Sequence, residues 1–168
     1  SNCTYPPLLL NFVKKLSQNT LFEDQDKMKL VMPCTSDEFV VREYLAYKLY
    51  QEISPVSFEA QLVHVNYQNP DGTLAHNPAV AFVVENCEEL VSRLGGKRNK
   101  TAMMSQNAVE KTTFLQTCLF QYMIGNTDWN VKNRHNLEFI QVPGYSFLVP
   151  VPFDFDYAGL VSAPYAAH

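Results

Sequence analysis

The chain has 168 residues, of which 46% are hydrophobic and 18% charged, and its formal net charge at pH 7 is −4. This composition is typical of one folded globular domain and excludes an intrinsically disordered segment. The acidic balance gives little electrostatic support to nucleic-acid binding, and no apolar run reaches the roughly 18 residues that a membrane span needs.

The first half of the chain predicts strands around one long helix. An apolar run that opens with two prolines favours an edge strand, and the polar stretch after it indicates a loop. Thr35 and Ser36, followed by two acidic residues, predict a helix start, and apolar residues recur on one face as far as Ile53. The segments expected to be strands are residues 5–12, 27–32, 58–67 and 79–84, the last two paired across a turn at residues 69–72.

The second half predicts two helices and a hairpin. A short helix over residues 88–94 ends at Gly95, and a basic loop follows over residues 97–105. A long helix is expected from about residue 106 to residue 124, where Gly125 stops it. The hairpin strands, residues 136–142 and 146–151, turn around Pro143 and Gly144. The fold class is therefore α+β.

An aspartate and two asparagines interrupt the apolar sequence between the long helix and the hairpin. Asp128 lies in a loop where a carboxylate can reach the proton of a hydroxyl nucleophile, although a simple turn hydrogen bond is the alternative role. Asn133 follows five residues later, and Asn136 immediately precedes the first hairpin strand. Either amide oxygen can ligate a hard cation such as Mg²⁺.

A pair of aspartates follows the hairpin. Asp154 and Asp156 alternate with Phe153 and Phe155, so we expect both carboxylates to project to one side of an extended segment. Two carboxylates so close repel each other unless a cation or hydrogen-bond donors compensate their charge. The pattern therefore predicts a metal site, with a solvated acidic strand end as the alternative.

A lysine and a glutamate in the first half are candidates for holding phosphate groups. Lys29 lies within a predicted strand, and Glu43 lies among apolar residues of the first helix, where it needs a cationic partner. Lys27 is a rival to Lys29 on the same face. The chain has no GxxxxGK[ST] motif, which excludes a P-loop nucleotide binder, and its four cysteines lack zinc-ligand spacing.

Taken together, the motifs "N-T-D-W", "H-N" and "P-F-D-F-D" resemble those of the CotH kinases, which have an atypical protein-kinase-like fold. A more distant likeness is to HipA-type and phosphoinositide-kinase-like proteins. The stretches "PPLLLNF", "TLFEDQDKMKLVMPC" and "EFVVREYLAYKLY" also resemble an uncharacterised group of bacterial CotH-like proteins. The likeness spans most of the chain.

The resemblance implies a two-lobed kinase-like fold that binds ATP with Mg²⁺ or Mn²⁺ between its lobes. Residues 1–84 would form the small lobe and residues 85–168 part of the large lobe, within a fragment of a longer chain. The resemblance also implies a protein substrate and an exported protein, which would suit a Cys3–Cys34 disulfide. Four buried cysteines that act as small hydrophobic residues are the alternative. Residues 83–86 would be the interlobe linker that faces the adenine.

On the same resemblance, Asp128 is the catalytic base and Lys29 with Glu43 grips the phosphates. Asp154, Asp156 and an asparagine hold the metal. Kinase spacing favours Asn133 for this role, whereas its place beside a strand favours Asn136, and we give more weight to the strand because loop lengths vary more readily.

A catalytically inactive kinase-like binding or scaffold module is the runner-up hypothesis. A structural surface domain, in which these polar residues only cap loops, is the third.

Overall fold

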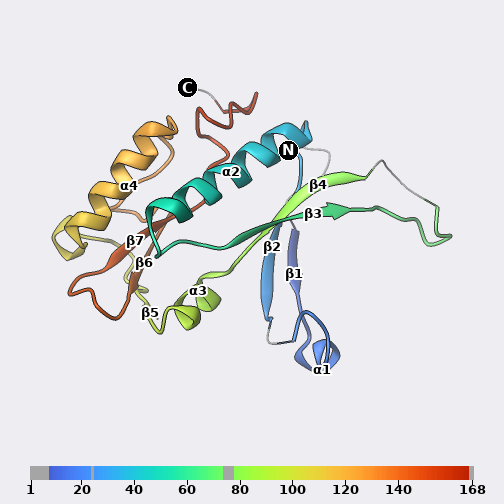
Figure 1. Ribbon diagram of the computed structural model, residues 1–168, viewed down its shortest axis with the longest axis horizontal. Coiled ribbons are helices and arrows are strands. Elements are labelled where there is room, and N and C mark those ends of the chain that lie inside the picture. Colours follow the sequence, from blue (N-terminus) through green and yellow to red (C-terminus); the bar gives the residue numbers. More distant parts are fainter. Residues whose placement is uncertain (1–7, 24, 74–77, 167–168) are drawn as a thin grey trace.

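The computed structural model describes residues 8–23, 25–73 and 78–166, and its mixture of helices and antiparallel sheets confirms the α+β class. A four-stranded sheet of order β1-β2-β4-β3 precedes a three-stranded sheet of order β5-β6-β7 (Figure 1). The strands are β1 (Leu8–Asn11), β2 (Lys27–Val31), β3 (Ala60–Val65), β4 (Ala79–Val84), β5 (Lys97–Arg98), β6 (Leu137–Gln141) and β7 (Val149–Pro152). The helices are α1 (Lys14–Ser17), α2 (Asp37–Ile53), α3 (Cys87–Arg93) and α4 (Lys111–Met123).

Helix α2 begins and ends where the sequence predicts. The Ser36 hydroxyl oxygen accepts a hydrogen bond from the Glu38 backbone N–H at 3.2 Å, which satisfies one of the free donors at the helix start. Along its buried face, the Tyr47 ring lies 5.6 Å from the Phe82 ring of β4. This contact fixes α2 against the larger sheet.

The larger sheet contains the one strand pair that the sequence predicts, residues 58–67 with residues 79–84, and adds a β2–β4 pair that was not predicted. Strands β3 and β4 pair antiparallel with Ala60 opposite Val84, and β2 pairs with β4 with Lys29 opposite the same Val84. Strand β1 lies at one edge, as its prolines predict. Because residues directly opposite each other share a face, Lys29 points to the same side of the sheet as Val84, which packs in the core with α2.

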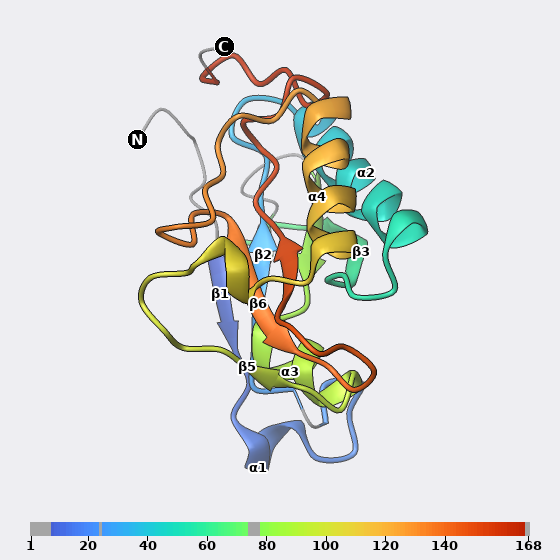
Figure 2. The same ribbon diagram turned by 90° about the vertical axis from the view of Figure 1, so that its left-hand side faces the viewer.

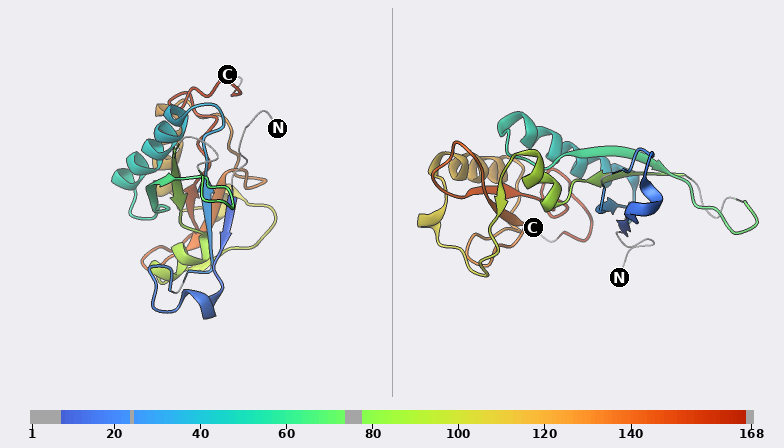
Figure 3. Two further views of the ribbon diagram at one scale, coloured as in Figure 1. Left: turned by 90° about the vertical axis from the view of Figure 1, so that its right-hand side faces the viewer. Right: turned by 90° about the horizontal axis from the view of Figure 1, so that it is seen from below.

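One hydrophobic core joins the two sheets. It contains Phe82 of β4, Val151 of β7 and Phe120 of α4, each almost fully buried. Helices α2 and α4 lie side by side on one flank (Figure 2), where the Tyr50 and Phe120 rings are 4.9 Å apart. Seen from below, β5 and α4 lie toward one end of the molecule and β3 and β4 toward the other (Figure 3).

Three segments differ from the sequence prediction. Helix α1 and strand β5 occupy stretches expected to be loops. The long helix α4 begins at Lys111, five residues later than expected, because residues 106–108 form a 3₁₀ turn and the Glu110 side chain accepts the Thr113 N–H at 2.7 Å. The Glu110 carboxylate thus supplies the helix start.

The predicted Cys3–Cys34 pairing lies outside the described residues, because Cys3 is not among them. In the described part of the chain, no helix is long and apolar enough to cross a membrane.

Candidate active site

The register of the β6–β7 hairpin places two of the candidate residues beside each other. Leu137 lies opposite Pro152, and one step further out the Phe153 N–H donates to the Asn136 carbonyl oxygen at 3.1 Å. Asn136, directly before β6, and Asp154, two residues after β7, therefore lie at the same end of the hairpin. Antiparallel pairing alone joins residues that are eighteen positions apart in the sequence.

Asp128 is held at the same end of the hairpin by three side chains. The Asn136 Nδ2 donates to the Asp128 carbonyl oxygen at 2.8 Å and to its Oδ2 at 3.0 Å. His135 Nε2 lies 2.8 Å from Asp128 Oδ1, and the Asp128 N–H donates to Asn126 Oδ1 at 3.0 Å. The carboxylate is thus fixed by hydrogen bonds while a third of its surface stays exposed to solvent.

Of the two candidate asparagines, the structure brings only Asn136 to Asp128. Asn136 is 8% exposed and has a positive φ of 51°, whereas the Asn133 side chain is exposed in a turn where its N–H donates to Asn130. Both hydrogen bonds of the Asn136 amide group use its nitrogen. Its oxygen therefore stays available as a ligand.

Lys29 reaches across from the larger sheet to the hairpin. Its Nζ lies 2.9 Å from Asp154 Oδ1, and both side chains are more than a third exposed. Burial lowers the pKa of Lys29, whereas the carboxylates of Asp154, Glu43 and Asp156 raise it. The effect of the carboxylates together is larger, so the net shift is upward. The amine is therefore cationic and surrounded by carboxylates.

Glu43 is a buried carboxyl group beneath this ion pair. Burial raises its pKa to about 8, with Asp154 and Asp156 adding to the effect and Lys29 opposing it. Its Oε1 has no hydrogen-bond partner among the described residues. The direct Lys29–Glu43 ion pair suggested by the sequence is not formed, because the lysine pairs with Asp154.

The segment that carries Asp154 and Asp156 is not the extended strand that we expected. Strand β7 ends at Pro152, and Asp154 has a φ of +60°, which turns the chain. The Asp154 N–H donates to the Tyr47 hydroxyl oxygen at 2.9 Å, which anchors the turn to α2. Burial, together with Asp154, raises the pKa of Asp156, while a hydrogen bond from Tyr165 opposes the rise.

The cluster carries more negative than positive charge. The three carboxylates of Asp128, Asp154 and Asp156 outnumber the single amine of Lys29, while Glu43, with its pKa raised to about 8, keeps its proton at pH 7. The effect of Asp128 on the pKa of Asp156 shows that the two loops are close. Within the described residues, no three His, Cys, Asp or Glu side chains form a ready-made metal group. A cation here would therefore need the Asn136 amide oxygen beside the aspartate oxygens, a donor set that suits Mg²⁺.

Besides His135, which the "H-N" motif places at this loop, three residues that shape the cluster were not assigned to it from the sequence. Asn126, buried directly after α4, and Tyr47 on α2 hold the two aspartate loops by single hydrogen bonds. His135 and Tyr165 contact Asp128 and Asp156 directly. The only sequence signal for Asn126 was its place between Gly125 and Thr127 in the "N-T-D-W" motif.

Comparisons of the chain with protein-family models, with curated proteins and with solved structures found no match.

Proposed function

We propose that this protein is an ATP- and metal-dependent phosphotransferase of the protein-kinase-like kind, with a protein as its substrate. One observation carries the proposal: the hairpin register brings Asp128, Asn136 and Asp154 together, and Lys29 joins them from the other sheet. A base, an amide oxygen, a carboxylate and a cationic amine within one cluster are the groups that phosphoryl transfer uses.

Asp128 is the proposed general base. Its two oxygens are oriented by His135 and Asn136, and its backbone N–H is bound by Asn126, so the carboxylate is held ready for a substrate hydroxyl. A base held in one orientation contributes to catalysis by positioning the nucleophile as well as by accepting its proton.

Asp154, Asp156 and the amide oxygen of Asn136 are the proposed metal ligands. The surplus of carboxylates around them favours a divalent cation. Burial raises the pKa values of Asp156 and Glu43, and neighbouring aspartates add to the rise. When bound, Mg²⁺ or Mn²⁺ would neutralise phosphate charge during transfer.

Lys29 is the proposed phosphate-binding amine, with Glu43 as its buried neighbour. The lysine stem is flexible, so its amine can leave Asp154 when phosphate oxygens are present. Residues 83–86, from the end of β4 to Asn86, which caps α3, connect the two halves of the chain. We assign the adenine to this linker.

The proposal is tested with the full chain by two measurements. ATP with Mg²⁺ should raise the thermal unfolding midpoint of the wild type, but not that of Asp154→Asn. Transfer of labelled phosphate to a generic protein substrate should be lost in Asp128→Asn and kept in Asp71→Asn, which alters an exposed carboxylate in the distant β3–β4 turn. An equal response of wild type and Asp154→Asn to ATP would refute the assignment.

A binding module without turnover is the second candidate, because in this structure Lys29 occupies one oxygen of the proposed metal ligand Asp154. Stabilisation by ATP and Mg²⁺ without any phosphate transfer, in wild type and Asp128→Asn alike, would favour this candidate.

A further inference from the structure

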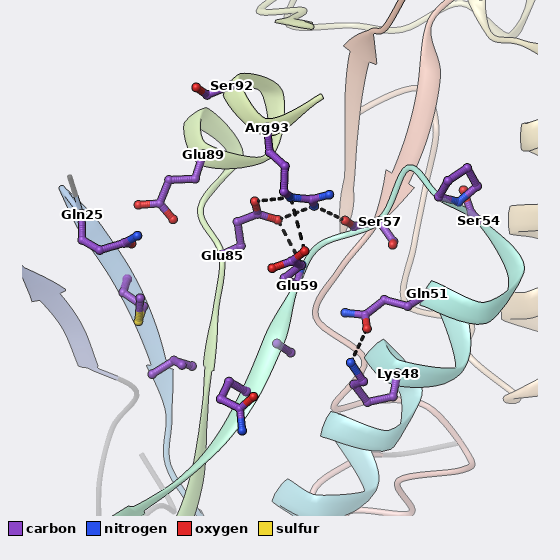
Figure 4. Close-up of a pocket in the computed structure, with 15 residues that line it drawn as sticks. Gln25, Lys48, Gln51, Ser54, Ser57, Glu59, Glu85, Glu89, Ser92 and Arg93 are labelled. Atoms are coloured by element: carbon purple, nitrogen blue, oxygen red, sulfur yellow. Dashed lines mark hydrogen bonds and ion pairs between the residues drawn. The ribbon is translucent and has the colours of Figure 1, made fainter. Parts of the chain in front are cut away.

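A hollow of about 900 Å³ lies beside the larger sheet and α3. It extends from α3 across the larger sheet and past β3 to the C-terminal half of α2 (Figure 4). None of the residues proposed as base, metal ligands or phosphate-binding groups lines it, whereas Val83 and Glu85 of the segment assigned to the adenine do. Most of its lining side chains are polar, with Gln61 on β3, Glu59 directly before that strand, and Gln51 on α2.

Strand β3 borders this hollow and is an edge strand of the described sheet. Its Glu59 carbonyl oxygen accepts the Glu85 N–H at 2.9 Å, which directs the backbone groups of Glu59 toward β4. Because inward and outward orientations alternate along an antiparallel strand, the N–H and C=O groups of Ala60, Leu62 and His64 face outward. An outward row of this kind can pair with another extended chain.

Two glutamine side chains donate amide hydrogens to backbone carbonyl oxygens on the outer edge of this segment, as the backbone of a further strand would. Gln51 Nε2 donates to the Phe58 carbonyl oxygen at 2.8 Å, and Gln61 Nε2 donates to the Leu62 carbonyl oxygen at 3.2 Å. Both carbonyl groups thus accept amide hydrogens from outside the sheet. The exposed Gln61 side chain can move aside, so a peptide N–H can take its place at Leu62.

The charges at the α3 end of the hollow favour a cationic side chain. Arg93 is bound to Glu85 at 2.8 Å and to the Ser57 carbonyl oxygen at 2.9 Å, which leaves Glu59 at a longer 3.6 Å with its side chain 68% exposed. Burial, with a contribution from neighbouring Glu85, raises the pKa of Glu89. Two carboxylates therefore lack full compensation by the single arginine.

We propose that the β3 edge and this hollow bind an extended segment of a partner protein that carries a lysine or arginine. The segment would add a strand beside Ala60, Leu62 and His64, and its basic side chain would lie beside the exposed Glu59 carboxylate. Main-chain hydrogen bonds would supply affinity and the carboxylates would supply the preference for a basic residue. Such binding needs no phosphate transfer, so its test is independent of the proposed function.

The test uses the full chain and a fluorescein-labelled peptide of eight alternating valine and lysine residues, followed by fluorescence anisotropy. We expect saturable binding that weakens at least about tenfold when alternate peptide amides are N-methylated, since the strand hydrogen bonds are then lost. Glu59→Lys should weaken binding about tenfold as well. Glu52→Lys, the same charge change on an exposed α2 position outside the hollow, should leave the affinity within about twofold.

Leu62→Pro removes an outward N–H without removing a bond to β4 and should also abolish binding. The N-methylated peptide leaves the protein unchanged, so it decides the question even if the proline variant fails to fold. Equal binding of the N-methylated peptide, or of a valine–glutamate peptide, would overturn the proposal. Concentration-dependent dimerisation that Leu62→Pro abolishes, without peptide binding, would overturn it in favour of a second copy.

Discussion

Replacing Glu43 with glutamine should change how the stability of the protein depends on pH. Glu43 is buried beneath the Lys29–Asp154 ion pair, and its pKa is raised from 4.5 to about 8. Between these values the folded protein keeps a proton that the unfolded chain has released. The free energy of unfolding of the wild type therefore falls as pH rises through this interval. Glutamine has nearly the same shape but cannot ionise.

The size of the effect follows from the raised pKa. Below pH 4.5 Glu43 is protonated in both states, so its full contribution to stability is present. Above that, each pH unit removes about 1.4 kcal/mol from the wild type, and the loss reaches on the order of 4–5 kcal/mol near pH 8. Relative to the wild type, the free energy of unfolding of the glutamine variant should therefore rise by about 1.4 kcal/mol per pH unit over this interval. Any destabilisation caused by the glutamine amide itself does not depend on pH and leaves this slope unchanged.

Urea unfolding of both proteins at pH 5, 6, 7 and 8 measures the difference directly. Other titrating groups, including Asp156, are present in both proteins, so their contributions largely cancel. Glu52→Gln, on an exposed position of the same helix, is the matched control and should differ from the wild type by the same amount at every pH. A difference between wild type and Glu43→Gln that stays constant from pH 5 to 8 would refute the burial of an ionisable Glu43.

Two further substitutions test the local structure. Asn126→Ala removes the acceptor of the Asp128 N–H and the donor to Gln121 Oε1. We therefore expect the free energy of unfolding, measured in urea, to fall by about 3 kcal/mol. A fall of less than about 1 kcal/mol would contradict the buried network. Gly96→Ala would place a Cβ only 2.6 Å from the Gln141 carbonyl oxygen, and we expect it to cost about 1–3 kcal/mol in the same assay, whereas an unchanged midpoint would show that the β5–β6 contact is looser.

The elements with strong local signals were predictable from the sequence. Helix α2 begins after the Ser36 cap and ends at Ile53, as expected, and the continuous apolar run of residues 79–84 forms β4. Strand β5 was missed because a two-residue strand, Lys97–Arg98, has no periodicity to detect and exists only by pairing with β6. Its sequence is that of a basic loop, and the tertiary contact decides its structure.

The sequence predicted which residues belong to the candidate site better than it predicted which of them contact each other. Asp128, Asn136 and Asp154 were identified from motif order, and the hairpin register brings them together. The partner of Lys29 could not be predicted, because choosing between Asp154 and Glu43 requires knowing how far the strand lies from each carboxylate. The positive φ of Asp154 could not be predicted from the local sequence either. The turned Asp154 backbone donates a hydrogen bond to Tyr47, which belongs to α2.

Helix α4 buries a different set of residues from the one that apolar periodicity alone favours. Leu115 and Leu119 are more than 60% exposed, whereas Thr117 and Gln121 are fully buried. Beside the buried Phe120, these polar groups find partners: Thr117 bonds the Tyr50 hydroxyl at 2.9 Å, and Gln121 Oε1 accepts from Asn126 Nδ2 at 3.0 Å.

These buried bonds continue directly into the site, because Asn126 in turn accepts the Asp128 N–H. A chain of hydrogen bonds inside the core therefore connects α4 to the proposed base. An apolar face in the same place would bury more hydrophobic surface but would leave the loop that carries Asp128 without its anchors. The position of Asp128 thus depends on the very residues that apolar periodicity would assign to the solvent-facing side of α4.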